Sequence, residues 1–434
     1  MSNQGNQPAP GQQRRYQGRI HMLQKEVMGR YFDELTKSAQ AGKDGVPAVY
    51  MLVSGNPVEL VLSFDLLPVY PEINALQLGV KKEALPHILR AEDMGYSMDN
   101  CAYVKADVGF FFSGRKSSFG LIPSPGLVLN NYVGCSIYLN WFEHLAAYAQ
   151  APIFNLDIPF DRLLDHQPRD EDVQYVVKQL KEVIGILERI SGKKFDPEKF
   201  RHIMELSRKT GELWSRVKHL TKHVPTPYDA FFDAVTLMAP MSCLRGTQAA
   251  YDFYVEALNE LEERVELGIG VLPEERFRIV IDGTPPWPYL RTFRDLFTRW
   301  GAVAVGATYP TVTGIWEFGF RHNPDRPLES MAEHMLKRNY TNGHLLHRFE
   351  QVRRYVEEWH ADAVVMHSIK SCRVVSAGQG DMREYFAHEL GVPSLLVESD
   401  IEDPRYFSEA QLRNRIDAFF ESLEHKKLVA ARAG

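Results

Sequence analysis

Cysteine is the residue type in this chain with the clearest capacity for metal chemistry. The sequence contains four cysteines, Cys101, Cys135, Cys243 and Cys372, and no two of them lie within 30 positions of each other. Ferredoxin-type clusters use much closer spacing, so any shared site must be assembled by the fold. Three thiolates that meet at one point suit an iron–sulfur cluster better than zinc, because structural zinc normally takes a fourth His or Cys ligand.

Two of the cysteines follow similar segments. Leu127–Leu129 is a short apolar run with a polar residue after it, and Cys135 comes six residues after Leu129. Val364–Met366 is followed in the same way by Cys372. This repetition predicts two similar α/β units, each of which brings a cysteine to the carboxyl edge of its sheet, where open α/β sheets bind ligands. Coincidence and buried structural thiols are the alternatives that the sequence leaves open.

The histidines give weaker signals. His322 follows Arg321 in a predicted loop, and it is either a ligand contact or a solvated side chain. His344 and His347 are three positions apart in a predicted helix, but nothing nearby completes a ligand set. We therefore expect both at the surface.

Familiar nucleotide and hydrolase motifs do not occur in the sequence. Gly109–Ser117 resembles a P-loop, but Arg115 stands between the second glycine and Lys116, where the motif needs the lysine immediately. His-Glu-x-x-His and Gly-x-Ser-x-Gly are both missing. We expect no ATP hydrolysis through a P-loop, and no zinc peptidase or α/β-hydrolase activity.

The composition is that of a globular protein. The chain has 434 residues, 44% of them hydrophobic and 24% charged, which suffices for two or three domains without a disulfide framework. Its 50 Lys and Arg against 56 Asp and Glu give a net charge of −6, which argues against a nucleic-acid partner. Neither a signal peptide nor an apolar run of about 18 residues is found, so we expect no membrane span and a cytoplasmic location.

Apolar runs and helical periodicity alternate along the chain. Short β-type runs form two groups, and between them long segments with a 3.6-residue period predict a helical layer. We expect a disordered tail over 1–18, a first α/β unit over 19–165, the helical segment over 166–272 and a second α/β unit over 273–434. The apolar piece 59–66 follows a Gly-Asn-Pro turn or helix start, and 108–112 is a strand-sized run. The other predicted strands are 47–54, 127–129, 152–156, 277–281, 302–306, 363–366 and 394–397, and the predicted helices are 137–149, 173–190, 197–220, 249–267 and 408–425.

Three cysteine contexts, taken together, resemble one family. They are Asp99–Asp107 around Cys101, Tyr132–Cys135, and Ser368–Cys372 followed by Ser376–Gln379. The supporting stretches are Phe320–His322, Val397–Asp400 and Asp403–Ser408. From about residue 20 to 425 the chain is similar to the 2-hydroxyacyl-CoA dehydratase and benzoyl-CoA reductase family. Within it, the likeness is strongest to the larger cluster-carrying subunit of the ATP-dependent reductase branch.

The resemblance implies an α/β fold of two flavodoxin-like parallel-sheet units with a helical layer between them. It implies a [4Fe-4S] cluster held by Cys101, Cys135 and Cys372, whereas Cys243 matches no ligand position and is expected to be a helix-packing thiol. The implied activity is reduction of an acyl-CoA, from benzoyl-CoA to cyclohexa-1,5-diene-1-carbonyl-CoA, in anaerobic aromatic degradation. The implied partners, in a heterotetramer, are a related cluster-carrying subunit and two ATPase subunits that hydrolyse ATP and pass on electrons from ferredoxin.

Further site residues are expected on this basis. The general acid near the ring is expected to be His322, and the cations for the CoA phosphates are Lys370, Arg373 and Arg321. Phe110–Phe112 and Pro285–Trp287 are expected to wall a water-poor pocket. Two alternatives stay open: a 2-hydroxyacyl-CoA dehydratase subunit, which uses the same cluster without net reduction, and a subunit that only relays electrons or supports its sister subunit.

Overall fold

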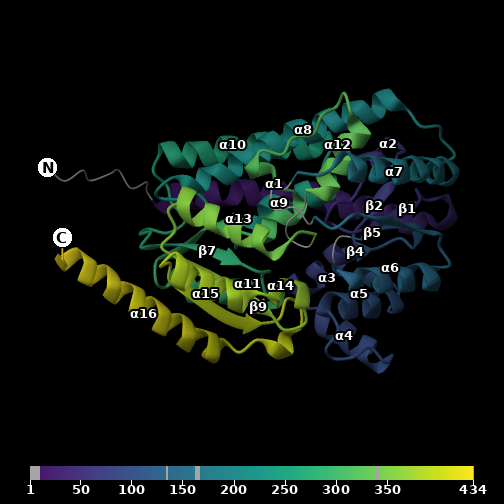
Figure 1. The fold of residues 1–434 in the computed structure, drawn as a ribbon. Helices are drawn as coiled ribbons and strands as arrows, with labels where there is room; N and C mark the ends of the chain where they lie inside the picture. Colours follow the sequence, from purple (N-terminus) through teal and green to yellow (C-terminus); the bar gives the residue numbers. More distant parts are fainter. Residues whose placement is uncertain (1–9, 133–134, 162–166, 338–341, 434) are drawn as a thin grey trace.

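Two four-stranded parallel sheets organise the protein (Figure 1). The computed structural model describes residues 10–132, 135–161, 167–337 and 342–433. The first sheet has the order β2-β1-β5-β6, and the second has the order β10-β9-β7-β8. The strands of the first are β1 (Ala48–Met51), β2 (Leu67–Val69), β5 (Pro125–Tyr132) and β6 (Ile153–Asp157), and those of the second are β7 (Phe277–Asp282), β8 (Ala302–Ala307), β9 (Ala363–Ile369) and β10 (Ser394–Ser399). A small antiparallel ribbon pairs β3 (Lys116–Ser117) with β4 (Gly120–Leu121).

Both sheets have the same topology. If the strands of each sheet are numbered in chain order, starting from β1 in the first sheet and β7 in the second, both sheets have the spatial order 2-1-3-4. The first sheet is read from β2 and the second from β8. In both sheets the third strand lies beside the first: β5 beside β1, and β9 beside β7. This is the order of flavodoxin-like folds, whose ligand crevice opens at the carboxyl ends of the strands where the strand order reverses. The predicted α/β class with two flavodoxin-like units is confirmed.

Each unit has its own set of helices. The helices of the first unit are α2 (Val58–Ser63), α3 (Pro71–Val80), α4 (Ala84–Asp93), α5 (Ala102–Phe112) and α6 (Ser136–Ala149). Those of the second are α11 (Leu290–Thr298), α13 (Leu345–Glu358), α14 (Arg373–Ser376), α15 (Gln379–Glu384) and α16 (Glu409–Ala433). Short turns of 3₁₀-helix include η3 (Trp287–Tyr289) and η5 (Trp316–Phe318). In the second unit, α11 and α16 share one apolar core with the sheet, and α13 shares another.

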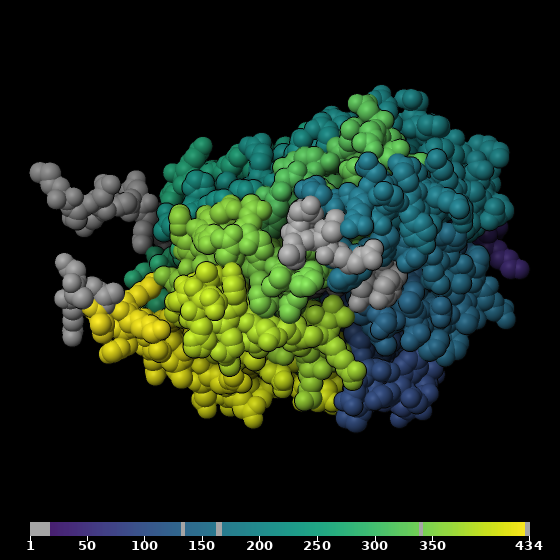
Figure 2. All heavy atoms as spheres, viewed as in Figure 1, coloured from purple at the N-terminus to yellow at the C-terminus, as the bar shows by residue number. Residues whose placement is uncertain are grey.

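A layer of long helices lies across both units. It consists of α1 (Pro10–Ala41), α7 (Asp170–Ser191), α8 (Pro197–His219), α9 (Ala234–Leu244), α10 (Gln248–Glu266) and α12 (Pro327–Leu336). Helix α1 packs against α9 and α10, while α8 packs against α2 of the first unit. Figure 2 shows the teal helical layer above the blue first unit and the yellow-green second unit, which adjoin each other. One continuous apolar core joins the first sheet to this layer, so the layer is part of the first unit's packing rather than a separate body.

Most predicted elements are found, and two apolar pieces whose type the sequence does not decide are helical. The apolar piece 59–66 contains helix α2, so the preceding Gly-Asn-Pro starts a helix, and the strand-sized run 108–112 is the end of α5. Every residue of α5 from Ala102 to Phe111 is buried. A helix that is buried on all sides has no exposed polar stripe and so no clear 3.6-residue pattern, and a short apolar run from it cannot be distinguished from a buried strand.

Two further expectations concern the ends and the surface of the chain. Residues 1–9 of the predicted disordered tail lie outside the described residues, and from Pro10 the backbone is helical. None of the helices in the described ranges is both long and apolar enough to cross a bilayer. His344 is exposed, as expected, whereas His347 is 2% exposed and lies 3.6 Å from the Asp161 carboxylate, so its predicted surface position is wrong.

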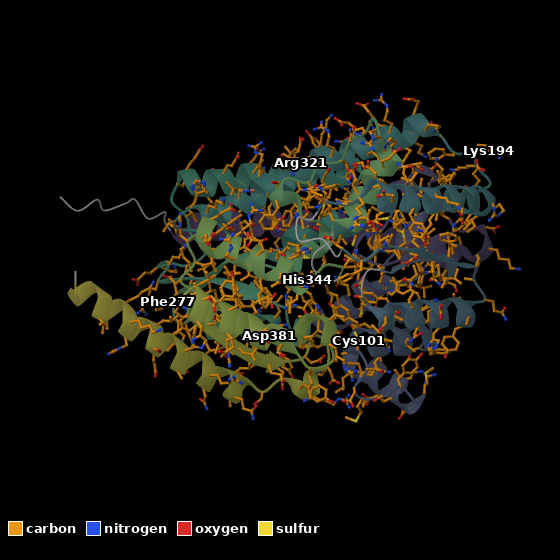
Figure 3. The ribbon with its side chains drawn as sticks, viewed as in Figure 1. Cys101, Lys194, Phe277, Arg321, His344 and Asp381 are labelled. Atoms are coloured by element: carbon orange, nitrogen blue, oxygen red, sulfur yellow. The ribbon has the colours of Figure 1, made fainter. Side chains whose placement is uncertain are left out.

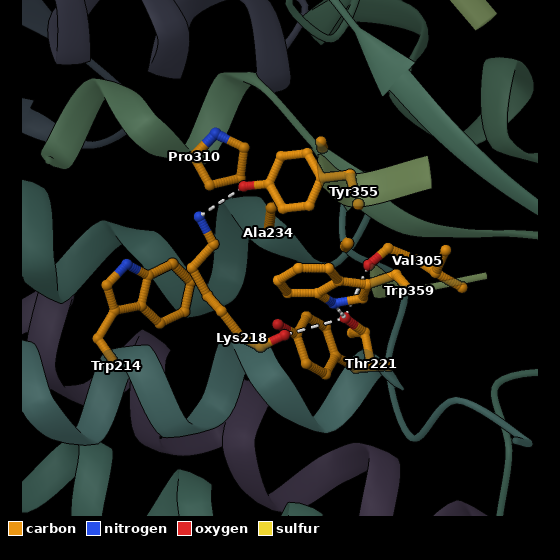
Figure 4. Close-up of a pocket in the computed structure, with 12 residues that line it drawn as sticks. Trp214, Lys218, Thr221, Ala234, Val305, Pro310, Tyr355 and Trp359 are labelled. Atoms are coloured by element: carbon orange, nitrogen blue, oxygen red, sulfur yellow. Dashed lines mark hydrogen bonds between the residues drawn. The ribbon is translucent and has the colours of Figure 1, made fainter. Parts of the chain in front are cut away.

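A buried ion pair between Lys218 and Glu317 joins the helical layer to the second unit, and Figure 4 shows the neighbouring hydrogen bond from Lys218 to Tyr355. Lys218, on α8, donates hydrogen bonds to Glu317 in η5 and, at 3.3 Å, to the hydroxyl of Tyr355 on α13. Its ammonium lies 5.8 Å from the ring centre of Trp214. Burial lowers the pKa of Lys218, and the charge of Glu317 opposes that shift. Because both charged groups are out of water, each depends on the other for compensation.

We predict that Lys218→Met lowers the free energy of unfolding by about 3–5 kcal/mol, because it leaves the Glu317 charge buried without its cation. The double variant Lys218→Met/Glu317→Gln should recover much of that loss. Urea unfolding followed by tryptophan fluorescence measures both. The matched control is Arg413→Met, which breaks an exposed pair with Glu409 and should cost less than about 1 kcal/mol. Equal losses for Lys218→Met and Arg413→Met would contradict the prediction.

Candidate active site between the two units

The first and second units meet where the loops at the carboxyl edges of their sheets touch. The N–H of Ala102, directly after Cys101, donates to the hydroxyl of Ser371, directly before Cys372, at 3.2 Å. The indole of Trp287, in η3, donates to the hydroxyl of Tyr103. These contacts place two of the predicted cysteine ligands on either side of one seam.

All three predicted ligands occupy the same position relative to a helix. Cys101 is the N-cap of α5, Cys135 of α6 and Cys372 of α14, each with non-helical backbone. The backbone N–H groups of the second and third helical residues that follow each cysteine lower the pKa of its thiol, but none of the three sulfurs makes a capping hydrogen bond. An N-cap side chain normally provides an oxygen acceptor for these N–H groups, so a cysteine at this position leaves them directed toward the thiol without a capping bond.

The three thiols also lie close enough to affect one another electrostatically. Burial raises the pKa of all three thiols, that of Cys135 to about 12. The charge of Cys372 raises the pKa of both Cys101 and Cys135 further. Three thiolates crowded together in a half-buried site are therefore unfavourable by themselves, and a positively charged metal centre would stabilise them.

The donor set fits an iron–sulfur cluster held by three thiolates. Hydrogen bonds from backbone N–H groups to the sulfurs are a feature that tunes such clusters. Among the described residues, no three or more His, Cys, Asp or Glu side chains are grouped as ligands of a single metal ion. Thiolates that bind one zinc ion at about 2.3 Å lie within about 4 Å of one another, whereas the thiolates of a [4Fe-4S] cluster each bind a different iron and lie farther apart.

The fourth cysteine lies elsewhere, as expected from its sequence context. Cys243 is on α9, fully buried in the apolar core that joins the helical layer to the first sheet. Burial is the sole cause that raises its pKa, and its charge affects Tyr31, Tyr70 and Tyr254 rather than the other thiols. It is a packing thiol.

His322 is buried in a different cluster, so the alternative of a solvated loop histidine is wrong. It is 2% exposed, its ring packs against Trp316 and His334, and its Nε2 lies 3.7 Å from the carboxylate of Glu59. Burial lowers the pKa of His322 to about 4, against the opposing charge of Glu59. The imidazole is therefore neutral near pH 7 and offers only its N–H as a proton source.

The three cationic residues predicted to bind the CoA phosphates lie in two different parts of the molecule. Lys370 and Arg373 are exposed and flank Cys372 in the sequence. Arg321 instead belongs to the helical-layer side of the molecule, well away from Cys101 in Figure 3. Its guanidinium donates to the backbone carbonyls of Trp316 and Phe320 at 2.7 and 2.6 Å. Of the three, Lys370 and Arg373 lie beside the thiols.

Of the two segments predicted to line the pocket, one lies at the seam and the other does not. Trp287 contacts Tyr103 at the seam and packs against Tyr309, with ring centres 5.5 Å apart. Phe110–Phe112 lie at the other end of α5 from Cys101, about 15 Å away at the helical rise per residue. These three phenylalanines do not wall the site.

A carboxylate that sequence reasoning missed lies beside the thiols. Glu72, in the first turn of α3, accepts a hydrogen bond from the N–H of Val53 at 2.6 Å and from the hydroxyl of Tyr138 at 2.7 Å. Its charge is one of the causes that raise the pKa of Cys135, after burial and Cys372. No sequence signal distinguishes it, since an acidic residue in the first turn of a helix is common.

The loop after β10 supports the second side of the seam. Asp400 accepts the N–H of Ser371 at 2.9 Å and those of Glu402 and Asp403 at 3.0 Å. Arg405 reaches across to Glu92 on α4, at 2.6 Å. Glu402 is fully buried, and its carboxyl lies against Gly79 of α3 so closely that a Cβ there would clash with it. The stretches Val397–Asp400 and Asp403–Ser408 therefore fix the position of Cys372 relative to the first unit.

Comparison with known proteins agrees with this arrangement. Residues 53–423 match the family model of the 2-hydroxyglutaryl-CoA dehydratase D-component, which is most of the chain. The chain belongs to this family. The matched residues include all four cysteines and both sheets except for β1, which ends at Met51.

Similar members of the family are components of two kinds of enzyme. The chain is 37% identical over 421 residues to a subunit of benzoyl-CoA reductase from Thauera aromatica, covering 94% of this chain and 96% of that protein. It is 30% identical to the alpha subunit of (R)-2-hydroxyisocaproyl-CoA dehydratase from Clostridioides difficile, over 91% and 94% of the two chains. It is 27% identical to the alpha subunit of lactoyl-CoA dehydratase from Anaerotignum propionicum, over 93% and 97%. Both kinds are catalytic, so this chain is an enzyme component.

We predict that Glu402 makes the stability of the seam depend on pH. Burial, together with the charges of Asp400 and Asp403, raises the pKa of Glu402 well above 4.5. Between its unfolded and folded pKa values, the folded chain keeps a proton that the unfolded chain has lost, so stability falls as pH rises through that window. The free energy of unfolding, measured in urea from pH 5 to pH 8, should fall by up to about 1.4 kcal/mol per pH unit more for the wild type than for Glu402→Gln.

The control for this measurement is Glu421→Gln, since Glu421 is exposed on α16. It should leave the pH dependence of the wild type unchanged. Equal pH dependence in the wild type and Glu402→Gln would show that Glu402 ionises normally and that the expectation is wrong.

Proposed function

We propose that this chain is the iron–sulfur subunit of an ATP-dependent, ferredoxin-linked aromatic acyl-CoA reductase that converts benzoyl-CoA to cyclohexa-1,5-diene-1-carbonyl-CoA. The observation that carries the proposal is that Cys101, Cys135 and Cys372 are all helix N-caps and lie near enough to affect one another's pKa values. The similarity to the benzoyl-CoA reductase of Thauera aromatica, at 37% identity over almost the whole of both chains, supports the choice of substrate.

The proposed reaction adds two electrons and two protons to the aromatic ring and leaves the thioester intact. A [4Fe-4S] cluster, when bound by the three cysteines, supplies single electrons at low potential. Reduced ferredoxin is the proposed source of both electrons, and two ATPase subunits of the complex are the proposed site of ATP hydrolysis. A second, related cluster-carrying subunit completes the proposed heterotetramer, which works in the cytoplasm without oxygen.

The contributions of this chain's own residues follow from their positions. The thiols of Cys101, Cys135 and Cys372 hold the metal centre, and backbone N–H groups stabilise their negative charge. Trp287 and its contact with Tyr103 help to keep water out, which matters because a strong reductant otherwise passes electrons to protons. Exposed Lys370 and Arg373 are the proposed partners of the CoA phosphates.

The alternative within the family is a 2-hydroxyacyl-CoA dehydratase subunit, which the relatives at 30% and 27% identity represent. A second alternative is a subunit that relays electrons while the substrate lies on its sister subunit. The three-thiol site is compatible with all three functions. The reaction product and the effect of substitutions near the thiols distinguish them.

We predict that the anaerobically purified complex contains about four iron and four sulfide per copy of this chain, in addition to those of its partners. Cys101→Ala, Cys135→Ala and Cys372→Ala should each remove this cluster and abolish formation of the dienoyl-CoA from benzoyl-CoA. Iron and sulfide analysis, together with product analysis by mass spectrometry, measures both effects. Cys243→Ala is the matched control and should retain the cluster.

Three results would contradict the proposal. A wild-type chain without iron, or loss of the cluster in Cys243→Ala alone, would remove the proposed site. Release of water from a 2-hydroxyacyl-CoA, with no reduction of benzoyl-CoA, would favour the dehydratase. Full reductase activity in a complex whose copy of this chain lacks the cluster would favour a supporting role.

The sequence and the structure suggest different proton donors. His322 is the donor proposed from the sequence, but the hydroxyl of Tyr138, which donates to the Glu72 carboxylate, is a protic group beside Cys135. We predict that Glu72→Gln lowers turnover of the complex more than tenfold, about 1.4 kcal/mol in the barrier, and that His322→Gln lowers it less. Both variants must retain normal iron content. The opposite order of effects would confirm His322 as the donor.

A further inference from the structure

A single buried carboxylate connects three helices below the thiols. Asp107, on α5, accepts a hydrogen bond from the side-chain amide of Asn74 on α3 at 3.2 Å and from the indole N–H of Trp141 on α6 at 3.1 Å. The three residues are 2%, 3% and 1% exposed. Two of these helices begin at cysteines of the proposed site, and the third carries Glu72 in its first turn.

The two cysteine-bearing helices meet at equal distances from their thiols. Asp107 comes six residues after Cys101, and Trp141 comes six residues after Cys135. At the helical rise, six residues correspond to about 9 Å along each helix axis. The hydrogen bond between Asp107 and Trp141 therefore fixes the relative position of two arms of equal length, each of which ends in a cysteine.

Simple packing does not explain a carboxyl group at this position. Both hydrogen bonds to Asp107 come from neutral donors, and neither an Arg nor a Lys is paired with it in the described part of the chain. Burial raises the pKa of Asp107 to about 7, so an ionised Asp107 destabilises the folded chain relative to the unfolded chain. An apolar side chain would avoid that cost, but it would have no directional bond with which to set the register of α5 against α6.

We propose that Asp107 is a positioning residue that sets the spacing and register of Cys101 and Cys135 through its hydrogen bonds to Trp141 and Asn74. The proposal deepens the proposed function, because it assumes that these two thiols act together. Asp107 does not touch the proposed metal centre. It acts through the helices that carry the ligands.

The test uses the metal-free full-length chain and a short thiol cross-linker, dibromobimane, which bridges only thiols that lie close together. Peptide mapping by mass spectrometry measures the yield of the Cys101–Cys135 bridge. Asp107→Asn should lower the yield of this bridge, because its amide has one acceptor oxygen and can no longer accept from both Asn74 and Trp141. The reciprocal double variant Asp107→Asn/Asn74→Asp restores a donor–acceptor pair and should restore the bridge.

The matched control is Asp229→Asn. Asp229 is also buried, its pKa is likewise raised to about 7 by burial and by Asp233, and it accepts N–H groups of Phe231, Phe232 and Ala304 in the second unit. Its substitution should destabilise the chain without changing the bridge. Trp141→Phe, which removes one donor and little volume, serves as the second test variant if Asp107→Asn fails to fold.

The outcomes separate this proposal from the proposed function. If the wild type gives no Cys101–Cys135 bridge, the thiols do not converge and the proposed function fails. If the wild type gives the bridge and folded Asp107→Asn and Trp141→Phe give it equally, the positioning role is overturned. Loss of the bridge in Asp229→Asn as well would also overturn it, because general loosening of the fold would then explain the effect.

Discussion

The hydrogen bond from the N–H of Ala102 to Ser371 joins residues 269 positions apart, and the proposed site depends on the contact that it represents. Parallel sheets gather their ligand-binding loops at one edge, but a single sheet of this topology supplies one crevice. Here two such edges face each other. The first contributes Cys101 and Cys135, and the second contributes Cys372, so the thiols meet only if the seam between the units is closed.

The seam is closed by polar contacts that are costly to separate. Arg405 pairs with Glu92 across it, and Asp400 holds the backbone of Ser371. The second unit's own crevice is meanwhile filled, because Arg348 forms a buried pair with Asp282, and Gln379 donates to the same carboxylate at 2.9 Å. The two units therefore have the same topology but different roles: the first provides two of the proposed ligands, and the second provides one.

The sequence predicted the fold class from periodicity, and the physical basis of that prediction has limits. The strand and helix periodicities of 277–281 and 197–220 are strong, and the repeated spacing before Cys135 and Cys372 reflects equivalent positions in two units. Helix α5 was not predictable, because a helix buried all round carries no pattern. Glu72, Tyr138 and Asp107 were not predictable either, since their roles arise from helices that meet only in three dimensions. His322 shows the opposite error: a loop context suggested access to a ligand, yet the loop folds into an aromatic cluster.

The division of the thiols between the two units has a consequence for biosynthesis. When Cys101 and Cys135 leave the ribosome, more than half of the chain, including the strand that precedes Cys372, has still to be made. Two of the three thiols of the proposed site are therefore made before the unit that lies opposite them. Insertion of the proposed metal centre would have to wait for the last strands, and until then the two thiols would be accessible to any oxidant present.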